Sequence, residues 1–223
     1  MKQINNQKGF TLVEIAIVLV IIGLLLGGVL KGQELVTNAK VKNAISSMNG
    51  VTTAYNAYID RYQRVPGDDG PIATLTGRGG QWATVSQVGN LNGALTITAA
   101  QTFTVAAAES VAFWQHVRAA GFVSGNPAAV GVAALLQNPF GGLTGVTAAG
   151  VTGMTGNAVC MSQVPGKAAI AIDSQLDDGS PNAVGGSVMA TTGGAAGVNT
   201  APGVAVVAGI YVETALYTVC RTL

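Results

Sequence analysis

Charge, aromatic side chains and metal-binding side chains are all scarce in this sequence. Charged residues make up 9% of its 223 residues and aromatic residues 5%, whereas charged residues average about 25% in soluble domains. The formal net charge of +1 gives no basic field and argues against a protein built to hold nucleic acid. One histidine and two cysteines are too few for a metal cluster. The 49% apolar content argues against disorder and is typical of a membrane protein, or of one that packs against its own copies.

Sequence motifs of catalysis are missing as well. No nucleophile elbow, phosphate-binding loop or zinc-peptidase motif is present. The segment Gly77–Gly80 fails the dinucleotide pattern, and Ala168 stands where a phosphate loop would need a hydroxyl after Gly166–Lys167. His116 lies among apolar neighbours, so we expect a structural histidine and not a base. The sequence therefore predicts a protein that is not an enzyme.

One long apolar run stands near the start of the chain, from Phe10 to Leu30, and Glu14 is its single charge. As a helix it would be about 31 Å long, enough to cross a bilayer once. Lys2 and Lys8 precede the run and favour a cytoplasmic N-terminus. The run is not followed by a signal-peptidase pattern of small residues. We therefore expect a single span over residues 10–30, with the rest of the chain on the outer side of the membrane.

The residues around the start of this run, Lys8–Ile15, read KGFTLVEI. This segment resembles the prepilin junction of type IV pilins and type II secretion pseudopilins. The resemblance implies that a prepilin peptidase cuts between Gly9 and Phe10, that residues 1–9 are a leader peptide, and that Phe10 becomes the N-methylated first residue. A looser similarity to pilin-like proteins covers residues 62–69, 113–122 and 173–181.

Glu14 is the glutamate of that motif, and its position has a physical cost. A carboxylate in a membrane helix costs on the order of 2.5–3.5 kcal/mol at the bilayer centre and usually has a partner. The cut would free an amine at Phe10 that is charged at neutral pH. We expect Glu14 of a neighbouring subunit to pair with this amine and to set the axial register of an assembly. The alternative is that Glu14 only reaches the headgroups while the leader stays attached.

Glycines are clustered in the second half of the apolar run. Gly23, Gly27, Gly28 and Gly32 form two small-xxx-small pairs, which let helices approach closely in lipid. The alternative is that these glycines have no packing role, because glycine is common in membrane helices in general. Many pilins have a proline near this point, whereas the first proline here is Pro66. The glycines would make the helix locally flexible, as that proline does, because glycine has a low helix propensity.

The helix is expected to continue in amphipathic form through residues 31–65. Pro66 disfavours helical geometry before it, so the helix should end near Gln63, and Pro66–Gly67 should form a tight turn. The apolar stripe predicted to face the rest of the protein consists of Val41, Ile45, Met48, Thr52, Tyr55, Ile59 and Tyr62.

Residues 66–223 are expected to form a β-rich globular head. A helix is predicted over Val105–Ala120, with Gly121 after its end. The glycine-rich stretches 141–156 and 185–203 are expected to be loops. Strands are predicted over Leu95–Thr98, Lys167–Asp173 and Val204–Thr218. The predicted fold class is α+β: a long N-terminal helix, half transmembrane and half amphipathic, packed on an antiparallel β-rich head.

Two features of the head point to specific chemistry. In an oxidising compartment Cys160 and Cys220 are expected to form a disulfide, the alternative being two free buried thiols. Asp177–Asp178 and Asp68–Asp69 are candidates for calcium, which major pseudopilins of secretion systems often bind. Two adjacent aspartates fall short of the six to eight oxygens that calcium takes. We therefore expect no metal and no other cofactor.

Together these features predict a structural subunit of a type IV pilus or of a pseudopilus. Its partners would be further copies of the chain in a helical filament, the prepilin peptidase and the inner-membrane assembly machinery, with no nucleic acid. It would sit in the bacterial inner membrane with its head in the periplasm, and then enter a periplasmic or cell-surface filament. Two alternatives stay open: a minor pilin or adhesin, and an anchored periplasmic binding protein that never polymerises.

Overall fold

A computed structural model describes residues 11–104, 108–181, 186–206 and 209–223. The chain forms two compact units, which divide between Ala39 and Lys40. Residues 1–9 and Phe10, where the predicted leader and cleavage site fall, lie outside the described residues.

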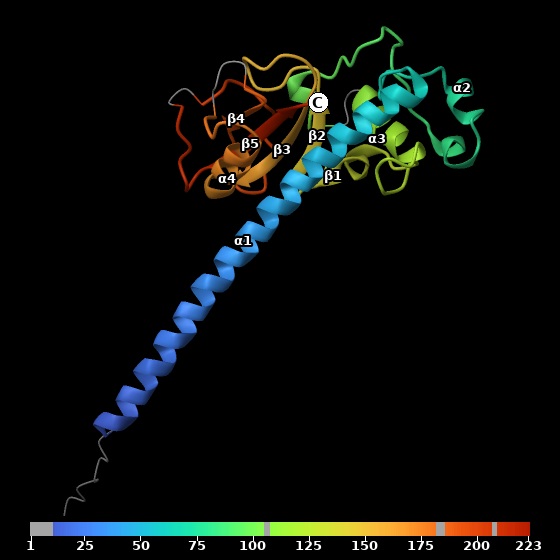
Figure 1. The fold of residues 1–223 in the computed structure, drawn as a ribbon. Coiled ribbons are helices and arrows are strands. Elements are labelled where there is room, and N and C mark those ends of the chain that lie inside the picture. The colour runs from blue at the N-terminus through green and yellow to red at the C-terminus, as the bar shows by residue number, and fades with distance from the viewer. Residues whose placement is uncertain (1–10, 105–107, 182–185, 207–208) are drawn as a thin grey trace, which may run out of the picture. The chain divides into compact units, whose positions relative to one another are not determined.

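From Leu12 onward, the described part of the first unit is helical and belongs to α1 (Leu12–Tyr62) (Figure 1). Every residue from 11 to 39 is exposed, and large apolar side chains such as Leu12 and Leu24 are 91% and 74% exposed. An apolar surface this extensive requires lipid or protein to cover it. By length and composition, α1 is also the one helix in the described part of the chain that could cross a membrane.

In the second unit, the remaining part of α1 buries one face against the head. That face consists of Val41, Ala44, Met48, Val51, Ala54 and Tyr58. The predicted stripe was wrong in part: Val41 and Met48 are buried, but its other members, such as Ile45 and Tyr55, lie half-buried at the edge. The predicted stripe follows the larger side chains. Ala44 and Ala54 instead mark the centre of the contact, because small side chains allow the closest approach of the helix to the core.

The end of α1 follows the prediction closely. The helix ends at Tyr62, and the Asp68 amide donates to the Val65 carbonyl at 3.0 Å. Gly67 has φ of 96° at the third position of this turn. That value belongs to the left-handed region, which glycine adopts without strain, and Pro66 suits the position before it. The turn leads into α2 (Ile72–Thr76) and the 3₁₀ helix η1 (Gly80–Thr84).

A five-stranded antiparallel sheet forms the C-terminal part of the head, in the order β1-β2-β3-β5-β4. Its central strands β3 and β5 are buried along most of their length. The long helix and the antiparallel sheet confirm the predicted α+β class. The strands are β1 (Leu136–Gln137), β2 (Leu143–Thr147), β3 (Ala158–Pro165), β4 (Val188–Thr192) and β5 (Leu216–Thr222).

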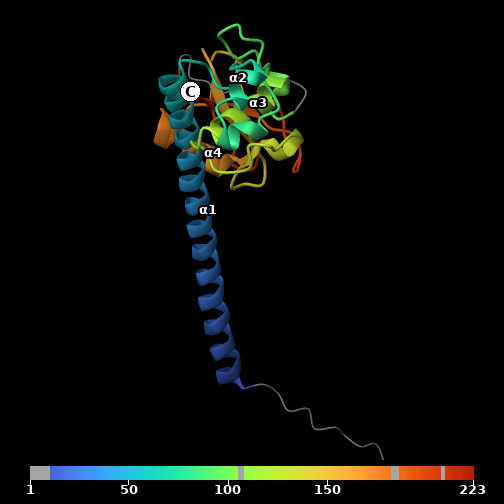
Figure 2. The same cartoon turned by 90° about the vertical axis from the view of Figure 1, so that its right-hand side faces the viewer.

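Two helices flank this sheet. α4 (Gly166–Leu176) lies against β3, β4 and β5, whereas α3 (Ala108–Ala119) lies against β2 and the 3₁₀ helix η3 (Gly131–Ala134) (Figure 1). Figure 2 views the head from the end that carries α2 and α3. A short 3₁₀ helix, η2 (Ala99–Gln101), precedes α3.

The predicted helix over residues 105–120 corresponds to α3. Every residue from 109 to 119 is buried, so this helix has no exposed polar face. Gly121 follows with φ of 80°, as expected of a residue after a helix end. Residues 105–107 of the prediction lie outside the described residues.

The predicted strands were mostly wrong. Residues 167–173 lie in the helix α4, where Ala168, Ala169, Ile172 and Asp173 form a buried helical face. The alternation in AAIAID resembles a strand, but a helix buries these small side chains equally well. Residues 95–98 form no strand, and of the range 204–218 only residues 216–218 belong to β5, with 207–208 outside the described residues. The predicted loops 141–156 and 185–203 contain β2 and β4.

Candidate functional site

The start of α1 is organised by two residues of the prepilin-like motif. The backbone N–H and the hydroxyl of Thr11 both donate to Oε2 of Glu14 at 2.8 Å. The Glu14 N–H approaches Thr11 Oγ1 at 3.3 Å in return. This reciprocal arrangement is a capping box, which satisfies N–H groups that the first turn of a helix leaves without partners. Among the described residues, the other oxygen of Glu14, Oε1, accepts no hydrogen bond.

The glycine cluster lies on the open surface of the same helix. Apart from its chain neighbours and the adjoining backbone of its own helix, a Cβ atom placed on Gly23, Gly27, Gly28 or Gly32 would meet no atom within 4 Å. Nothing within the described part of the chain therefore requires glycine at these four positions. The expected close approach of another helix stays a prediction.

Cys160 and Cys220 form the predicted disulfide, with an S–S distance of 2.00 Å. They stand directly opposite each other on β3 and β5, and both are fully buried. Phe103, Val151 and Met189 pack around them in a small apolar cluster. The disulfide thus joins two central strands across a separation of 60 residues.

A polar and aromatic cluster fixes the end of α1 within the head. The buried carboxylate of Asp69 accepts from the Tyr58 hydroxyl and from Nη2 of Arg78, each at 2.8 Å. The Arg78 guanidinium lies 4.5 Å from the ring centres of both Tyr62 and Trp82, which places a cation over two aromatic faces. Burial, followed by the bond to Asp69, raises the pKa of Tyr58 and keeps this hydroxyl protonated. The cluster acts as a structural brace.

His116 is held between two backbone groups, as expected of a structural histidine. Its Nδ1 accepts from the Gly67 N–H at 3.0 Å, which leaves Nε2 as the donor to the Gln87 carbonyl at 3.1 Å. Burial lowers the pKa of His116 to about 4, and the Gln87 carbonyl opposes that shift in part. Both ring nitrogens are therefore occupied, and the ring is neutral at physiological pH.

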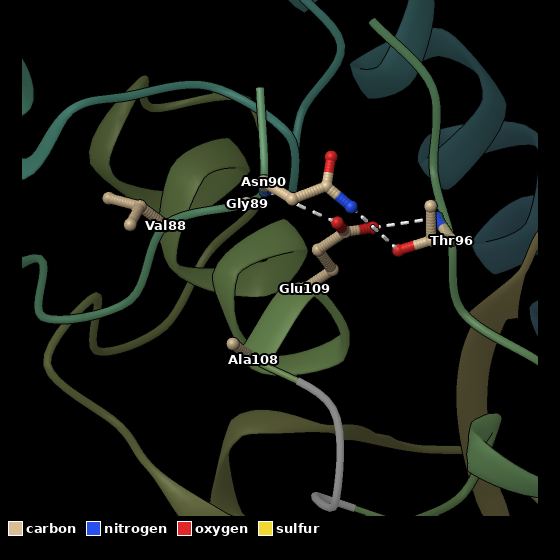
Figure 3. Close-up of a pocket in the computed structure, with 6 residues that line it drawn as sticks. All are labelled: Val88, Gly89, Asn90, Thr96, Ala108 and Glu109. Atoms are coloured by element: carbon tan, nitrogen blue, oxygen red, sulfur yellow. Dashed lines mark hydrogen bonds between the residues drawn. The ribbon is translucent and has the colours of Figure 1, made fainter. Parts of the chain in front are cut away.

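Two buried carboxylates hold the loop formed by residues 88–96, named here the pinned loop. Asp68 accepts from the amides of Leu91 and Gly93, each at 2.6 Å. Glu109 of α3 accepts from the amides of Asn90 and Thr96 at 3.4 and 2.6 Å (Figure 3). Four N–H groups of the loop therefore donate to carboxylates, and hydrogen bonds to carboxylates are stronger than those to neutral acceptors. Neither interaction has a local sequence signal, beyond the rarity of acidic residues in the head.

A cavity of about 240 Å³ lies beside the pinned loop (Figure 3). Its charged lining group is the Glu109 carboxylate, whose two oxygens already accept loop amides. A ligand would have to displace these bonds to use that charge. The residues that line the cavity are Val88, Gly89, Asn90, Thr96, Ala108 and Glu109.

The calcium candidates Asp177 and Asp178 lie together at the end of α4, where Asp173 joins them. Oxygens of the three carboxylates lie within 4.8 Å of one another. Asp173 accepts from the Tyr211 hydroxyl at 2.6 Å, and burial raises the pKa of Asp173 to about 6. Oδ2 of Asp177 accepts from the Val188 N–H at 3.0 Å. Three carboxylates that are bonded elsewhere do not match the six to eight oxygens that calcium takes. Asp68 and Asp69, the other candidate pair, are committed to the contacts described above.

The comparisons with known proteins single out the N-terminal segment. Residues 4–30 match the family described as the prokaryotic N-terminal methylation motif. No curated protein and no solved structure matches the chain. The matched residues include Thr11, Glu14 and the exposed apolar surface that follows them. In residues 4–30, the chain therefore carries the N-terminal signature of the type IV pilins and pseudopilins.

Proposed function

We propose that this chain is the structural subunit of a type IV pilus or of a pilus-like secretion filament. The leader of residues 1–9 is removed after Gly9, Phe10 is N-methylated, and the mature subunits polymerise through their N-terminal helices. One observation carries the proposal: the methylation motif leads directly into an apolar helix with every residue from 11 to 39 exposed. Lipid covers that surface before assembly, and helices of other copies cover it afterwards.

Glu14 has the role of registering one subunit against the next. Its Oε2 serves the helix cap of its own chain, and its Oε1 is left for the Phe10 amine of a neighbouring copy. In an apolar filament core this ion pair has few competing partners, so a stagger that brings the two charges together is strongly preferred. The contact repeats without closing, which yields a fibre from a single type of subunit.

The proposed location follows from the same helix. The subunit first sits in the bacterial inner membrane, with its head in the periplasm, and then joins a periplasmic or cell-surface filament. A buried disulfide in the head suits an oxidising compartment. The prepilin peptidase and the inner-membrane assembly machinery are the expected partners.

The first test examines sheared cell-surface or periplasmic filaments by mass spectrometry. A subunit of the filament yields a peptide that begins with N-methylated Phe10, abundant for a major subunit and scarce for a minor one. Recovery of the mature protein with Met1 intact, and its absence from filaments, would refute the proposal and favour the anchored binding protein.

The second test replaces Glu14 with Ala or Gln. We expect either variant to be inserted and processed normally but to reduce filament yield by at least about tenfold, because breaking a buried ion pair costs about 3–5 kcal/mol. Glu34→Ala is the matched control, since Glu34 is an exposed glutamate of the same helix that pairs with Lys31. Wild-type amounts of filament from Glu14→Ala would show that register does not depend on this carboxylate.

A further inference from the structure

The chain contains two Asn-Gly dipeptides in very different surroundings. Asn49–Gly50 lies inside α1, whereas Asn92–Gly93 lies in the pinned loop, where Gly93 has φ of 87°. Asn-Gly is the dipeptide in which the following backbone nitrogen most easily reaches the asparagine side chain, because glycine has no Cβ to hinder it. Both dipeptides are exposed. Their difference therefore lies in backbone geometry and in hydrogen-bond partners.

At Asn92 both the nucleophilic nitrogen and the attacked carbonyl oxygen of this intramolecular reaction have a hydrogen-bond partner. The Gly93 nitrogen would be the nucleophile, and its N–H donates to Oδ2 of Asp68 at 2.6 Å. The side-chain carbonyl of Asn92 would be the electrophile, and its Oδ1 accepts from the Ala94 N–H at 2.9 Å. A carboxylate thus stands ready to take the proton of the nucleophile. A backbone N–H polarises the carbonyl and stabilises negative charge on its oxygen.

We propose that Asn92–Gly93 is a site of self-catalysed deamidation in the folded head. The Gly93 nitrogen attacks Cγ of Asn92 while its proton passes to Asp68. The bond between Cγ and Nδ2 then breaks, and Nδ2 leaves as ammonia with that proton, so that Asp68 is regenerated. The resulting succinimide ring is opened by one water molecule to give aspartate or isoaspartate at position 92.

Asn49 provides the contrast within the same chain. Its Oδ1 accepts from Arg221 of β5, and the Gly50 backbone is held in the regular geometry of α1. In a helix each N–H points along the axis towards the preceding turn, so the nitrogen is not presented to the side chain of its own neighbour. We therefore expect the helical dipeptide to react slowly although its sequence is the same.

The modification would loosen the contact that holds the pinned loop. Isoaspartate adds one methylene to the backbone and displaces the Gly93 N–H from Asp68. Asp68 is 3% exposed, so the loss leaves a buried carboxylate oxygen without its donor. Either product also adds a negative charge to an exposed loop of a head with few charges. The reaction would therefore mark the age of a subunit by changing both its charge and its stability.

The test uses the full-length chain in detergent micelles at neutral pH, incubated and then digested with trypsin. The two dipeptides fall in different tryptic peptides, and mass spectrometry gives the rate of ammonia loss and isoaspartate formation in each. We expect Asn92 to react at least about tenfold faster than Asn49, a barrier difference of about 1.4 kcal/mol. We also expect Asn92 to react faster in the folded chain than in the chain unfolded in urea. Equal rates at the two sites, or a slower rate at Asn92 on folding, would overturn the proposal.

Two variants separate the contributions at Asn92. Ala94→Pro removes the N–H that polarises the carbonyl and keeps the residues Asn92, Gly93 and Asp68, so the folded rate should fall towards that of the unfolded chain. Asp68→Asn removes the proton acceptor and should have the same effect. If Asp68→Asn does not fold, as tryptophan fluorescence would reveal, Ala94→Pro decides alone. An unchanged folded rate in Ala94→Pro would refute the proposed geometry.

Discussion

Replacing His116 with glutamine should remove a defined part of the pH dependence of head stability. In the unfolded chain histidine titrates near pH 6.5, but burial lowers the pKa of His116 to about 4 in the folded head. Between pH 6.5 and about 4, the His116 ring is therefore protonated in the unfolded state but not in the folded state. Stability supplied by the neutral ring is therefore complete above pH 6.5 and is lost progressively as the pH falls to about 4.

The size of this effect follows from the shift. At about 1.4 kcal/mol for each pH unit, the difference between the two pKa values corresponds to about 3 kcal/mol. His116→Gln also loses a bond to the Gly67 N–H or to the Gln87 carbonyl, which lowers stability equally at every pH. We therefore expect the difference in the free energy of unfolding, wild type minus His116→Gln, to fall by about 3 kcal/mol between pH 7 and pH 4.

Urea unfolding followed by tryptophan fluorescence measures this difference in the full-length chain in detergent. Both tryptophans, Trp82 and Trp114, are buried in the head, so the signal reports on the head alone. Parallel curves for the wild type and His116→Gln over this pH range would refute the reasoning, because they would mean that His116 has the same pKa in both states.

Two further predictions concern the head. Replacing Cys160 and Cys220 together with serine should lower the free energy of unfolding by about 4 kcal/mol, because the disulfide closes a loop of about 60 residues in the unfolded chain; urea unfolding measures the loss, and dithiothreitol should destabilise the wild type but not the variant. Asp173→Asn should act in the opposite direction to His116→Gln. Burial raises the pKa of Asp173 to about 6, so its ionisation lowers stability as the pH rises from about 4 to 6. The asparagine variant should lack that decline, and an unchanged pH profile of the unfolding midpoint would show that Asp173 titrates normally.

The features that the sequence predicted well are those set by local chemistry. The apolar run, the turn at Pro66–Gly67 and the helix end at Gly121 each depend on a few adjacent residues with strong conformational preferences. The disulfide was predictable because the chain has two cysteines and an implied oxidising location. Glu14 was recognisable because a single charge interrupts an apolar run.

The features that the sequence did not reveal depend on residues far apart in the chain. Strands β2 and β4 are rich in glycine, threonine and alanine, so they lack the alternation of large apolar and polar side chains that marks a strand. The bonds from Asp68 and Glu109 to the pinned loop span between 13 and 25 residues. No local pattern specifies such bonds, because a buried carboxylate selects whichever amides the fold brings within reach.

The order of strands in the sheet has a consequence for how the head is made. β5 comes after the other four strands in the chain, yet it lies between β3 and β4 and pairs with both. Until residues 216–222 are in place, β3 has no partner on one side and β4 has none at all within the sheet. The sheet is therefore completed only when this strand has formed, and until then the edges of β3 and β4 that face it can pair with neighbouring chains.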